Sequence, residues 1–367
     1  MISYALPLKR VNEFKSVQRS LVLFENAIDS KATLKLYVGG LKNYMKFVGF
    51  ETRYDDYVNL DPKLIDRHLE DFVMFHASRG VKGSSVRGYL KPVYLFLDVN
   101  RIQYYPKAIN RLIPKDKTKK GGEKPFTDEE IQNMIDYTNE SRTKALVLFF
   151  ASIGGRSAVL TDPILKFKHL FSMPYGCKAV LCYAGSDEEY WAFLTPESSK
   201  ALEVYRDERI KNGENITPES PLFVIRKKNR FKDETYLSIP ALNSIFFNLE
   251  RKAPLERIKT GNRYDKAMMY GFRKRFNTIL KINNEVNSNI AEKLMAHKNG
   301  LDGVYLKPTR EECFAEFIKA IPELTVSKAE KLSLKLNKIE SEKDLRIQEL
   351  ESKMSEVLKL LERVNHE

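Results

Sequence analysis

The chain has 367 residues, of which 43% are hydrophobic, so it is long enough for two domains with buried cores and an extension. It carries 62 lysines and arginines against 49 aspartates and glutamates, a formal net charge of +13. This balance favours a polyanionic partner such as nucleic acid, although a solvated basic surface without such a partner would have the same composition.

Several classes of protein and site are not expected. The three cysteines, Cys177, Cys182 and Cys313, have no metal-ligand spacing, and their odd number argues against a disulfide framework. The sequence shows no early apolar run typical of a signal peptide and no apolar stretch near the ~18 residues of a membrane span. It also contains no glycine-rich phosphate loop. We therefore expect an intracellular, cytoplasmic protein that needs no metal, no cofactor and no membrane.

Residues 1–29 have no clear pattern and are treated as an N-terminal extension. Between residues 30 and 112, apolar residues recur every three or four positions in three runs. These runs predict helices that begin near Lys31, at Asp61-Pro62 and at Ser84-Ser85, and hence a small all-helical domain. Its basic surface residues are Lys42, Lys46, Lys82, Arg87 and Lys91.

Residues 113–125 are rich in lysine and contain two prolines and a Gly-Gly pair. This composition predicts a linker. Two roles are open for it, a solvated tether or a basic strap that lies along a phosphate backbone. Its candidate DNA-binding residues are Lys115, Lys117, Lys119 and Lys120.

A second domain is predicted for residues 126–322. Thr127 and Glu130 form a capping box, and an apolar helix over 145–153 ends at Gly154-Gly155, directly before Arg156. Residues 178–194 predict two short strands around a turn at Gly185-Ser186. Together with the helical runs around them, these patterns indicate a mainly α protein with a small β-sheet, the α+β class.

The stretch from residue 290 to residue 317 places two polar aromatic residues between two anchored helices. His297 follows a short apolar helix, and Tyr305 comes eight positions later. Thr309 and Glu312 then form a capping box that opens the next helix. An earlier helical run around residues 268–279 carries Arg273, with Lys274 and Arg275 directly after it.

The remaining residues, 323–367, carry a heptad-like pattern. Apolar residues alternate in steps of three and four, which is typical of a coiled coil. An amphipathic helix folded back on its own domain would show the same pattern. The apolar positions are Leu336, Ile339, Ile347, Leu350, Met354, Val357, Leu361 and Val364.

Four motifs occur in order: Arg156 after Gly-Gly, Tyr270-Gly-Phe-Arg273, Leu294-Met295-Ala296-His297, and then Tyr305. Over about residues 30–320 this order resembles the tyrosine recombinases, or phage-type integrases. The strand end FLTPE (residues 193–197) and the segment LMAHKNGLDGVYLKPT (residues 294–309) are most similar to integrases of archaea and their mobile elements. The resemblance implies a helical (SAM-like) core-binding domain at 30–112, a basic linker at 113–125 and a catalytic domain at 126–322.

The resemblance also implies roles for single residues. Arg156 and Arg273 match the two catalytic arginines, His297 matches the later histidine, and Tyr305 matches the nucleophile. Tyr270 stands where the family often has histidine. Lys274 and Arg275 would add contacts to DNA.

Two further departures concern a glycine and a lysine of the family pattern. Ala296 replaces the glycine that usually precedes the histidine. The family's catalytic lysine lies at the end of the second strand or in the hairpin turn, where this chain has Ala184-Gly185, so Lys178 is the nearest substitute.

The implied reaction is cleavage and rejoining of duplex DNA through a phosphotyrosine, by a homo-oligomer that is a tetramer on DNA. Two alternatives remain. One is a DNA-binding protein with the recombinase fold that no longer cuts, which the missing hairpin lysine favours. The other is a structural protein that oligomerises through its coiled coil and does not bind DNA at moderate salt.

Overall fold

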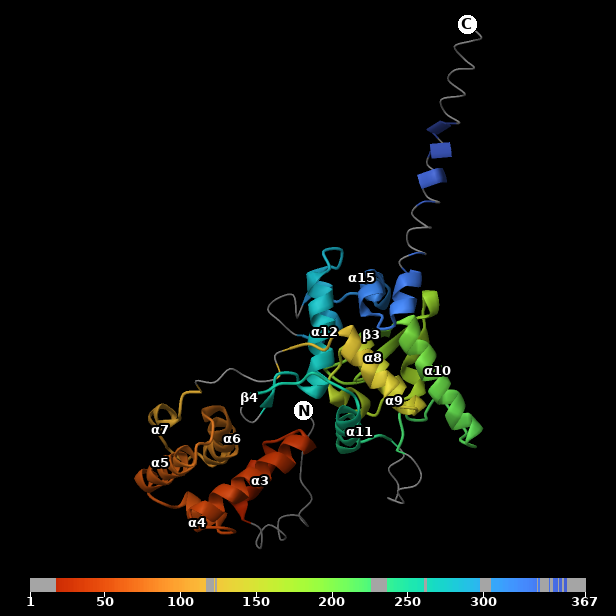
Figure 1. The fold of residues 1–367 in the computed structure, drawn as a ribbon. Helices are drawn as coiled ribbons and strands as arrows, with labels where there is room; N and C mark the ends of the chain where they lie inside the picture. Colours follow the sequence, from red (N-terminus) through yellow and green to blue (C-terminus); the bar gives the residue numbers. More distant parts are fainter. Residues whose placement is uncertain are drawn as a thin grey trace, which may run out of the picture. The chain divides into compact units, whose positions relative to one another are not determined.

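The computed structural model describes residues 18–116, 122, 124–225, 236–260, 263–297, 305–334, 336, 343, 346–348, 350–351 and 353–354, with only the backbone at positions 31, 260 and 263. The chain divides into two compact units, Met1–Lys119 and Lys120–Glu367 (Figure 1). The expected fold class is confirmed, because helices dominate and the only sheets among these residues are small.

The first unit is all-helical in its described part. The three predicted helices are confirmed as its longest ones, and Ser30 and Asp61 cap two of them with their side chains. Tyr44 and Tyr57 meet in the core through a hydroxyl–hydroxyl hydrogen bond of 2.6 Å. The helices are α2 (Arg19–Asn26), α3 (Lys31–Phe47), α4 (Tyr54–Val58), α5 (Pro62–Ser78), α6 (Gly83–Val99) and α7 (Pro106–Leu112).

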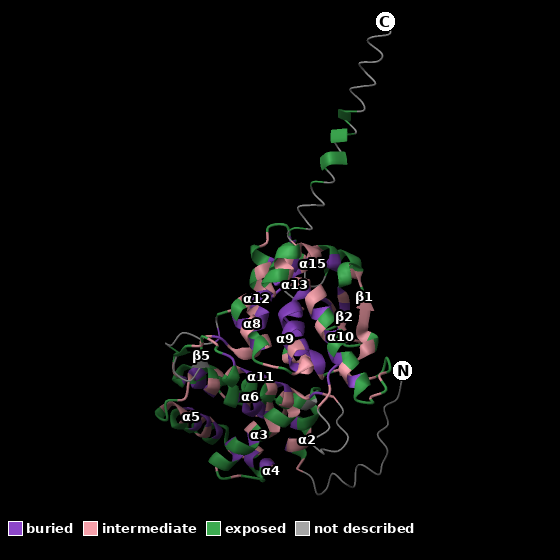
Figure 2. Ribbon diagram, turned by 45° about the vertical axis from the view of Figure 1, so that its right-hand side comes forward, coloured by how far each residue is buried: buried purple, intermediate pink, exposed green. Residues whose placement is uncertain are grey.

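The second unit is built around α9 (Ser141–Ile153). This helix is apolar on nearly every side and is buried at the centre of the unit (Figure 2), as expected for a helix without a polar face. It packs against α8 (Asp128–Asp136), α10 (Pro196–Lys211) and α12 (Met268–Ile282). The central position of α9 fixes the glycine turn that follows it.

A three-stranded antiparallel sheet lies beside α9. Its order is β1 (Leu170–Ser172), β2 (Lys178–Cys182) and β3 (Tyr190–Leu194). The predicted hairpin is confirmed as β2 and β3, whereas β1 has too few residues to show a period of two. The shorter elements are 3-10 helices η1 (Ser157–Leu160), η2 (Phe167–His169) and η3 (Pro174–Gly176), and strands β4 (Lys259–Thr260) and β5 (Arg263–Tyr264).

Three more helices complete the unit: α11 (Ile239–Lys252), α13 (Ser288–Leu294) and α15 (Arg310–Leu324). Thr309 and Glu312 form the predicted capping box of α15. All three cysteines are buried and free, and burial raises the pKa of Cys177 and Cys182 to about 12. Within the described ranges, no helix is both long and apolar enough to cross a membrane.

The C-terminal tail starts from a fixed point on this unit. The carboxylate of Glu197 accepts hydrogen bonds from the amides of Val326 and Ser327, at 2.8 and 3.1 Å. Residues 328–334 are helical. Leu336, Ile347, Leu350 and Met354 are exposed, while Ile339, Val357, Leu361 and Val364 lie outside the described residues.

Asp128 ties three parts of the second unit together. Its carboxylate accepts from the buried guanidinium of Arg275 at 2.6 Å and from the Nζ of Lys331 at 2.6 Å. Arg275 also donates to the carbonyls of Glu323 and Leu324 at the end of α15. Burial alone would raise the pKa of Asp128, but Arg275 and Lys331 outweigh it and the net shift is downward.

Asp128→Asn should therefore destabilise the second unit by roughly 2 kcal/mol, because it leaves a buried guanidinium without its counter-charge. A carboxylate with a depressed folded pKa contributes stability above its unfolded pKa, and this contribution is lost as the pH falls through the folded pKa. The difference from wild type should therefore shrink below about pH 4. Urea unfolding at pH 7 and pH 3.5 measures both effects.

Asp136→Asn is the matched control, because this exposed residue lies on the same helix and accepts a hydrogen bond from the neutral side chain of Gln132. Its effect should stay within about 0.5 kcal/mol at both pH values. Equal losses in the two variants would contradict the assigned role of Asp128.

Candidate active site

The double glycine after α9 is required by close packing. Gly154 has a φ of 56°, and a Cβ at this position would lie 2.6 Å from the Cβ of Phe276 on α12. Only glycine fits such a left-handed position at this distance. The turn sets Arg156 at the start of η1 and leaves the Gly154 carbonyl facing α12.

Arg273, on α12, is held in the site by three acceptors. Its Nη1 donates to the Gly154 carbonyl at 2.9 Å, and its Nη2 donates to the Met295 carbonyl at 2.6 Å. The same Nη2 lies 2.9 Å from Nε2 of His297. A guanidinium has five N–H donors, so Nε–H and one Nη1–H remain without an acceptor among the described residues.

His297 contacts a carboxylate that also forms an ion pair with a lysine. Its Nδ1 is 2.5 Å from Oε2 of Glu292, and the other carboxylate oxygen is 2.5 Å from the Nζ of Lys281. Ala296, before the histidine, has a φ of 52°, which favours glycine. The alanine therefore stands in a left-handed backbone conformation that glycine adopts more readily.

The charge on Arg273 is unbalanced. Two other buried arginines of this unit each have a carboxylate partner: Arg209 pairs with Glu214 and Arg275 with Asp128, both at 2.6 Å. Arg273 has only neutral partners among the described residues. Burial lowers its pKa, and repulsion from Arg156 lowers it further, so the site would gain stability from a bound anion.

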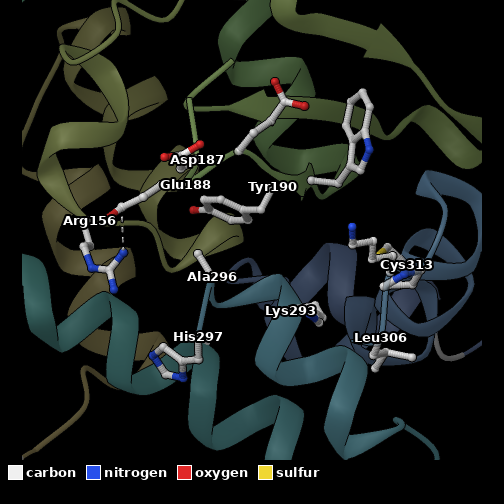
Figure 3. A pocket seen from close by; sticks show the side chains of 13 residues that line it. Arg156, Asp187, Glu188, Tyr190, Lys293, Ala296, His297, Leu306 and Cys313 are labelled. Atoms are coloured by element: carbon white, nitrogen blue, oxygen red, sulfur yellow. Dashed lines mark ion pairs between the residues drawn. The ribbon is translucent and has the colours of Figure 1, made fainter. Parts of the chain in front are cut away.

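A cavity of about 750 Å³ opens beside these groups (Figure 3). Arg156 and His297 lie at one end of it, and Leu306 and Cys313 at the other. Its remaining lining residues are Asp187, Glu188, Glu189, Tyr190, Trp191, Lys293, Ala296, Lys307 and Pro308.

The turn of the β2–β3 hairpin brings negative charge to this cavity. Arg156 lies 3.7 Å from the carboxylate of Glu188, and both side chains are largely exposed. An exposed pair at this distance is weak. A polyanionic ligand would therefore displace the pair at little cost.

Arg273 contacts His297, and Arg156 lies close enough to repel Arg273. Arg156 and His297 line the same cavity. Tyr305 is 79% exposed and directly precedes the cavity-lining residues Leu306 to Pro308. Residues 298–304, which link it to His297, lie outside the described part. The role of Tyr305 thus stays a prediction.

Two other candidate residues of the site, Tyr270 and Lys178, do not line the cavity. Tyr270 is exposed one turn before Arg273, close enough to oppose the fall in the pKa of that arginine. Lys178 is not among the residues that line the cavity. Its Nζ lies 3.0 Å from the carboxylate of Glu203 on α10.

The candidate DNA-binding residues also differ in exposure. Lys274 is half-buried, and Arg275 is buried in its contacts with Asp128, which leaves it no surface for a phosphate. Lys82 is half-buried. Lys117, Lys119 and Lys120 lie outside the described residues. The exposed candidates are Lys42, Lys46, Arg87, Lys91 and Lys115.

Sequence reasoning missed Glu188 and Glu292. The run Asp187-Glu188-Glu189 was a visible signal, because it is an acidic turn in a basic chain. Glu292 had no such signal, since its role depends on where α13 meets α12. Among the described residues, no group of three or more histidines, cysteines, aspartates or glutamates could hold a metal ion.

The chain matches no protein-family model and no curated protein at the level of sequence. It is similar in structure to the XerH site-specific recombinase bound to its difH substrate, with a TM-score of 0.51 and 15% identity over 81% of this chain and 86% of that one. It is also similar to the Tn1549 transposon integrase in complex with transposon right end DNA, with a TM-score of 0.52 and 15% identity over 82% of this chain and 99% of that one. These similarities establish the fold.

Gly154→Ala should destabilise the second unit by about 3 kcal/mol, because the new Cβ would overlap Phe276 and would hold a left-handed φ. Gly213→Ala is the control, since Gly213 has a φ of 82° in the same unit but open space around it. It should cost only about 1 kcal/mol. Urea unfolding of both variants measures the difference in the free energy of unfolding. Equal losses of stability would contradict the role of close packing at Gly154.

Proposed function

We propose that this chain, which has the fold of the tyrosine recombinases, is a site-specific recombinase that cleaves and rejoins duplex DNA through a 3′-phosphotyrosine, without metal or ATP. The observation that carries the proposal is the buried Arg273, which has no carboxylate partner among the described residues and contacts His297. His297 and Arg156 line the same cavity. The segment that follows Tyr305 lines the same cavity.

The two arginines suit a phosphodiester. Attack on phosphorus places extra negative charge on the non-bridging oxygens, and fixed N–H donors stabilise that charge. Arg273 retains Nε–H and one Nη1–H for this purpose. Arg156 is 42% exposed, and it contacts the carboxylate of Glu188 and the hydroxyl of Tyr183. An exposed ion pair of this kind is weak, so exchange of Glu188 for a phosphate would cost little.

Tyr305 supplies the group that becomes linked to DNA. Its oxygen forms a bond to phosphorus, the bond from phosphorus to the 5′ oxygen breaks, and the phenol proton passes to a base. The new phosphate ester stores the energy of the broken bond, so attack by a 5′ hydroxyl reverses the step without ATP.

The leaving 5′ oxygen needs a proton. The turn of the hairpin has no lysine for this role, and Lys178, at the start of β2, forms an ion pair with Glu203. Lys293 and Lys307 line the cavity and are the nearer candidates. The proton donor in this chain has thus moved out of the hairpin in the proposed mechanism.

We assign the parts of the chain accordingly. Residues 30–112 act as the core-binding domain, 113–125 as a basic linker and 126–322 as the catalytic domain, between extensions at 1–29 and 323–367. Exposed lysines of the first unit and a net charge of +13 support contact with duplex DNA. The active form would be a homo-oligomer, a tetramer on DNA, in the cytoplasm and near the nucleoid.

A second candidate function is DNA binding without cleavage. It is favoured by the acidic hairpin, where Glu188 contacts Arg156 in place of a lysine that would protonate the leaving group. Both functions predict duplex binding that weakens steeply with salt. Only the cleaving function predicts a covalent protein–DNA adduct.

Tyr305→Phe should abolish a covalent protein–DNA adduct while DNA binding and folding persist, because it removes one exposed hydroxyl. Nicked duplexes from the chain's own genome, which lose a short fragment after cleavage, would trap the adduct for electrophoresis under denaturing conditions. The protein should remain on the 3′ phosphate and release a 5′ hydroxyl.

Arg156→Ala and Arg273→Ala should each slow adduct formation by an amount that corresponds to about 3 kcal/mol. Tyr264→Phe is the control, since this tyrosine is also exposed but packs on Arg257. An adduct that persists in Tyr305→Phe would show that another residue is the nucleophile. A wild type that binds duplex but gives no adduct would favour the non-cutting function.

Removal of residues 335–367 should lower the association state, because the exposed heptad positions have no apolar cover in the described structure. This truncation keeps the bonds of Val326, Ser327 and Lys331 to their own unit. Light scattering of the full and truncated chains measures the masses. An unchanged mass would favour a helix that folds back.

A further inference from the structure

The hydrogen bonds around His297 fix where its proton lies. A guanidinium has only donors, so Nε2 must accept from Nη2 of Arg273 and carries no hydrogen. Burial opposes ionisation of Glu292, but hydrogen bonds from Lys281 and His297 hold its pKa below the ordinary value. An ionised carboxylate only accepts, so Nδ1 must donate to it.

We infer that Glu292 is a positioning residue of the candidate active site: it keeps the proton of His297 on Nδ1, so that Nε2 presents its lone pair to Arg273. Four side chains thus form one line, with Lys281 on Glu292, Glu292 on His297 and His297 on Arg273. The inference about the tautomer stands on these contacts alone, and its consequence for cleavage rests on the proposed function.

The tautomer decides how the guanidinium of Arg273 is oriented. Both hydrogens of Nη2 are used, one by the Met295 carbonyl and one by His297. If the imidazole proton moved to Nε2, an N–H would face the N–H of Nη2, and the ring would have to turn away. Arg273 would then lose one of three acceptors and the fixed orientation of its remaining donors.

The same geometry limits what His297 does. The only lone pair of its neutral ring is occupied by Arg273, so in this arrangement the ring cannot take the proton of Tyr305. His297 instead orients the guanidinium. A histidine beside a phosphate can act as a general base or as a hydrogen-bond donor to the phosphate, and neither role operates while the bond to Arg273 is intact.

The experiment reads the tautomer directly from the ring nitrogens of the full chain labelled with ¹⁵N-histidine. The chain has five histidines, so His297→Gln identifies the signals of interest by their loss. Wild type should show a protonated Nδ1 and an unprotonated Nε2 at His297. An Nε2-protonated neutral ring in the wild type would overturn the inference.

Two substitutions at Glu292 separate positioning from general destabilisation. Glu292→Gln keeps an amide oxygen as acceptor and should retain the Nδ1-protonated ring. Glu292→Leu removes the acceptor and should give a mixture of both tautomers. Glu311→Leu, which removes an exposed carboxylate on α15, should change nothing at His297. An unchanged tautomer in Glu292→Leu would also overturn the inference.

Single-turnover adduct formation at saturating DNA tests the consequence. Glu292→Leu should slow it on the order of 100-fold with an unchanged Kd for DNA, since a displaced guanidinium misplaces the reacting phosphate. Glu292→Gln should stay within about tenfold of wild type. An unslowed Glu292→Leu would show that the tautomer does not matter for cleavage. No adduct in wild type would contradict the proposed function, while the ¹⁵N spectra would still decide the tautomer.

Discussion

A buried guanidinium without a counter-charge is the constraint on which the second unit depends. Arg273 is 7% exposed, and its partners are two carbonyl oxygens and one imidazole nitrogen. The carbonyls come from the ends of α9 and α13, so the burial of one side chain requires that these two helix ends meet on α12. The glycine at the end of α9 exists because nothing larger fits there.

The local electrostatics follow from this arrangement. Neutral acceptors solvate the charge of Arg273 but do not cancel it. The electrostatic potential therefore stays positive near the end of the cavity that Arg156 and His297 line. The hairpin carboxylates supply the opposite sign at the cavity wall, but through weak and exposed contacts. A phosphate bound here would replace the weak contact between Glu188 and Arg156 with a stronger one.

Much of the architecture could be predicted from the sequence, because long apolar periods and capping residues are local signals. The helices α3, α5, α6 and α9 and the hairpin of β2 and β3 are examples. Short elements such as α4 and β1 have too few residues to show a period. The gathering of Arg156, Arg273 and His297 could be expected only from a family pattern, since no local rule joins residues over a hundred positions apart. Arg275 shows the limit of such reasoning: it was expected on DNA, and its true partner, Asp128, is distant in sequence.

The two arginines of α12 also bear on how such a protein can change over evolutionary time. Arg275 stabilises the unit through Asp128, whereas Arg273, two positions earlier, has neutral partners among the described residues, one of which is the cavity-lining His297. Positions 128 and 275 are therefore expected to change together over evolutionary time, because loss of either partner alone leaves a charge without its counter-charge. Position 273 is under a different constraint, since its side chain joins the ends of α9 and α13 to α12 through neutral acceptors.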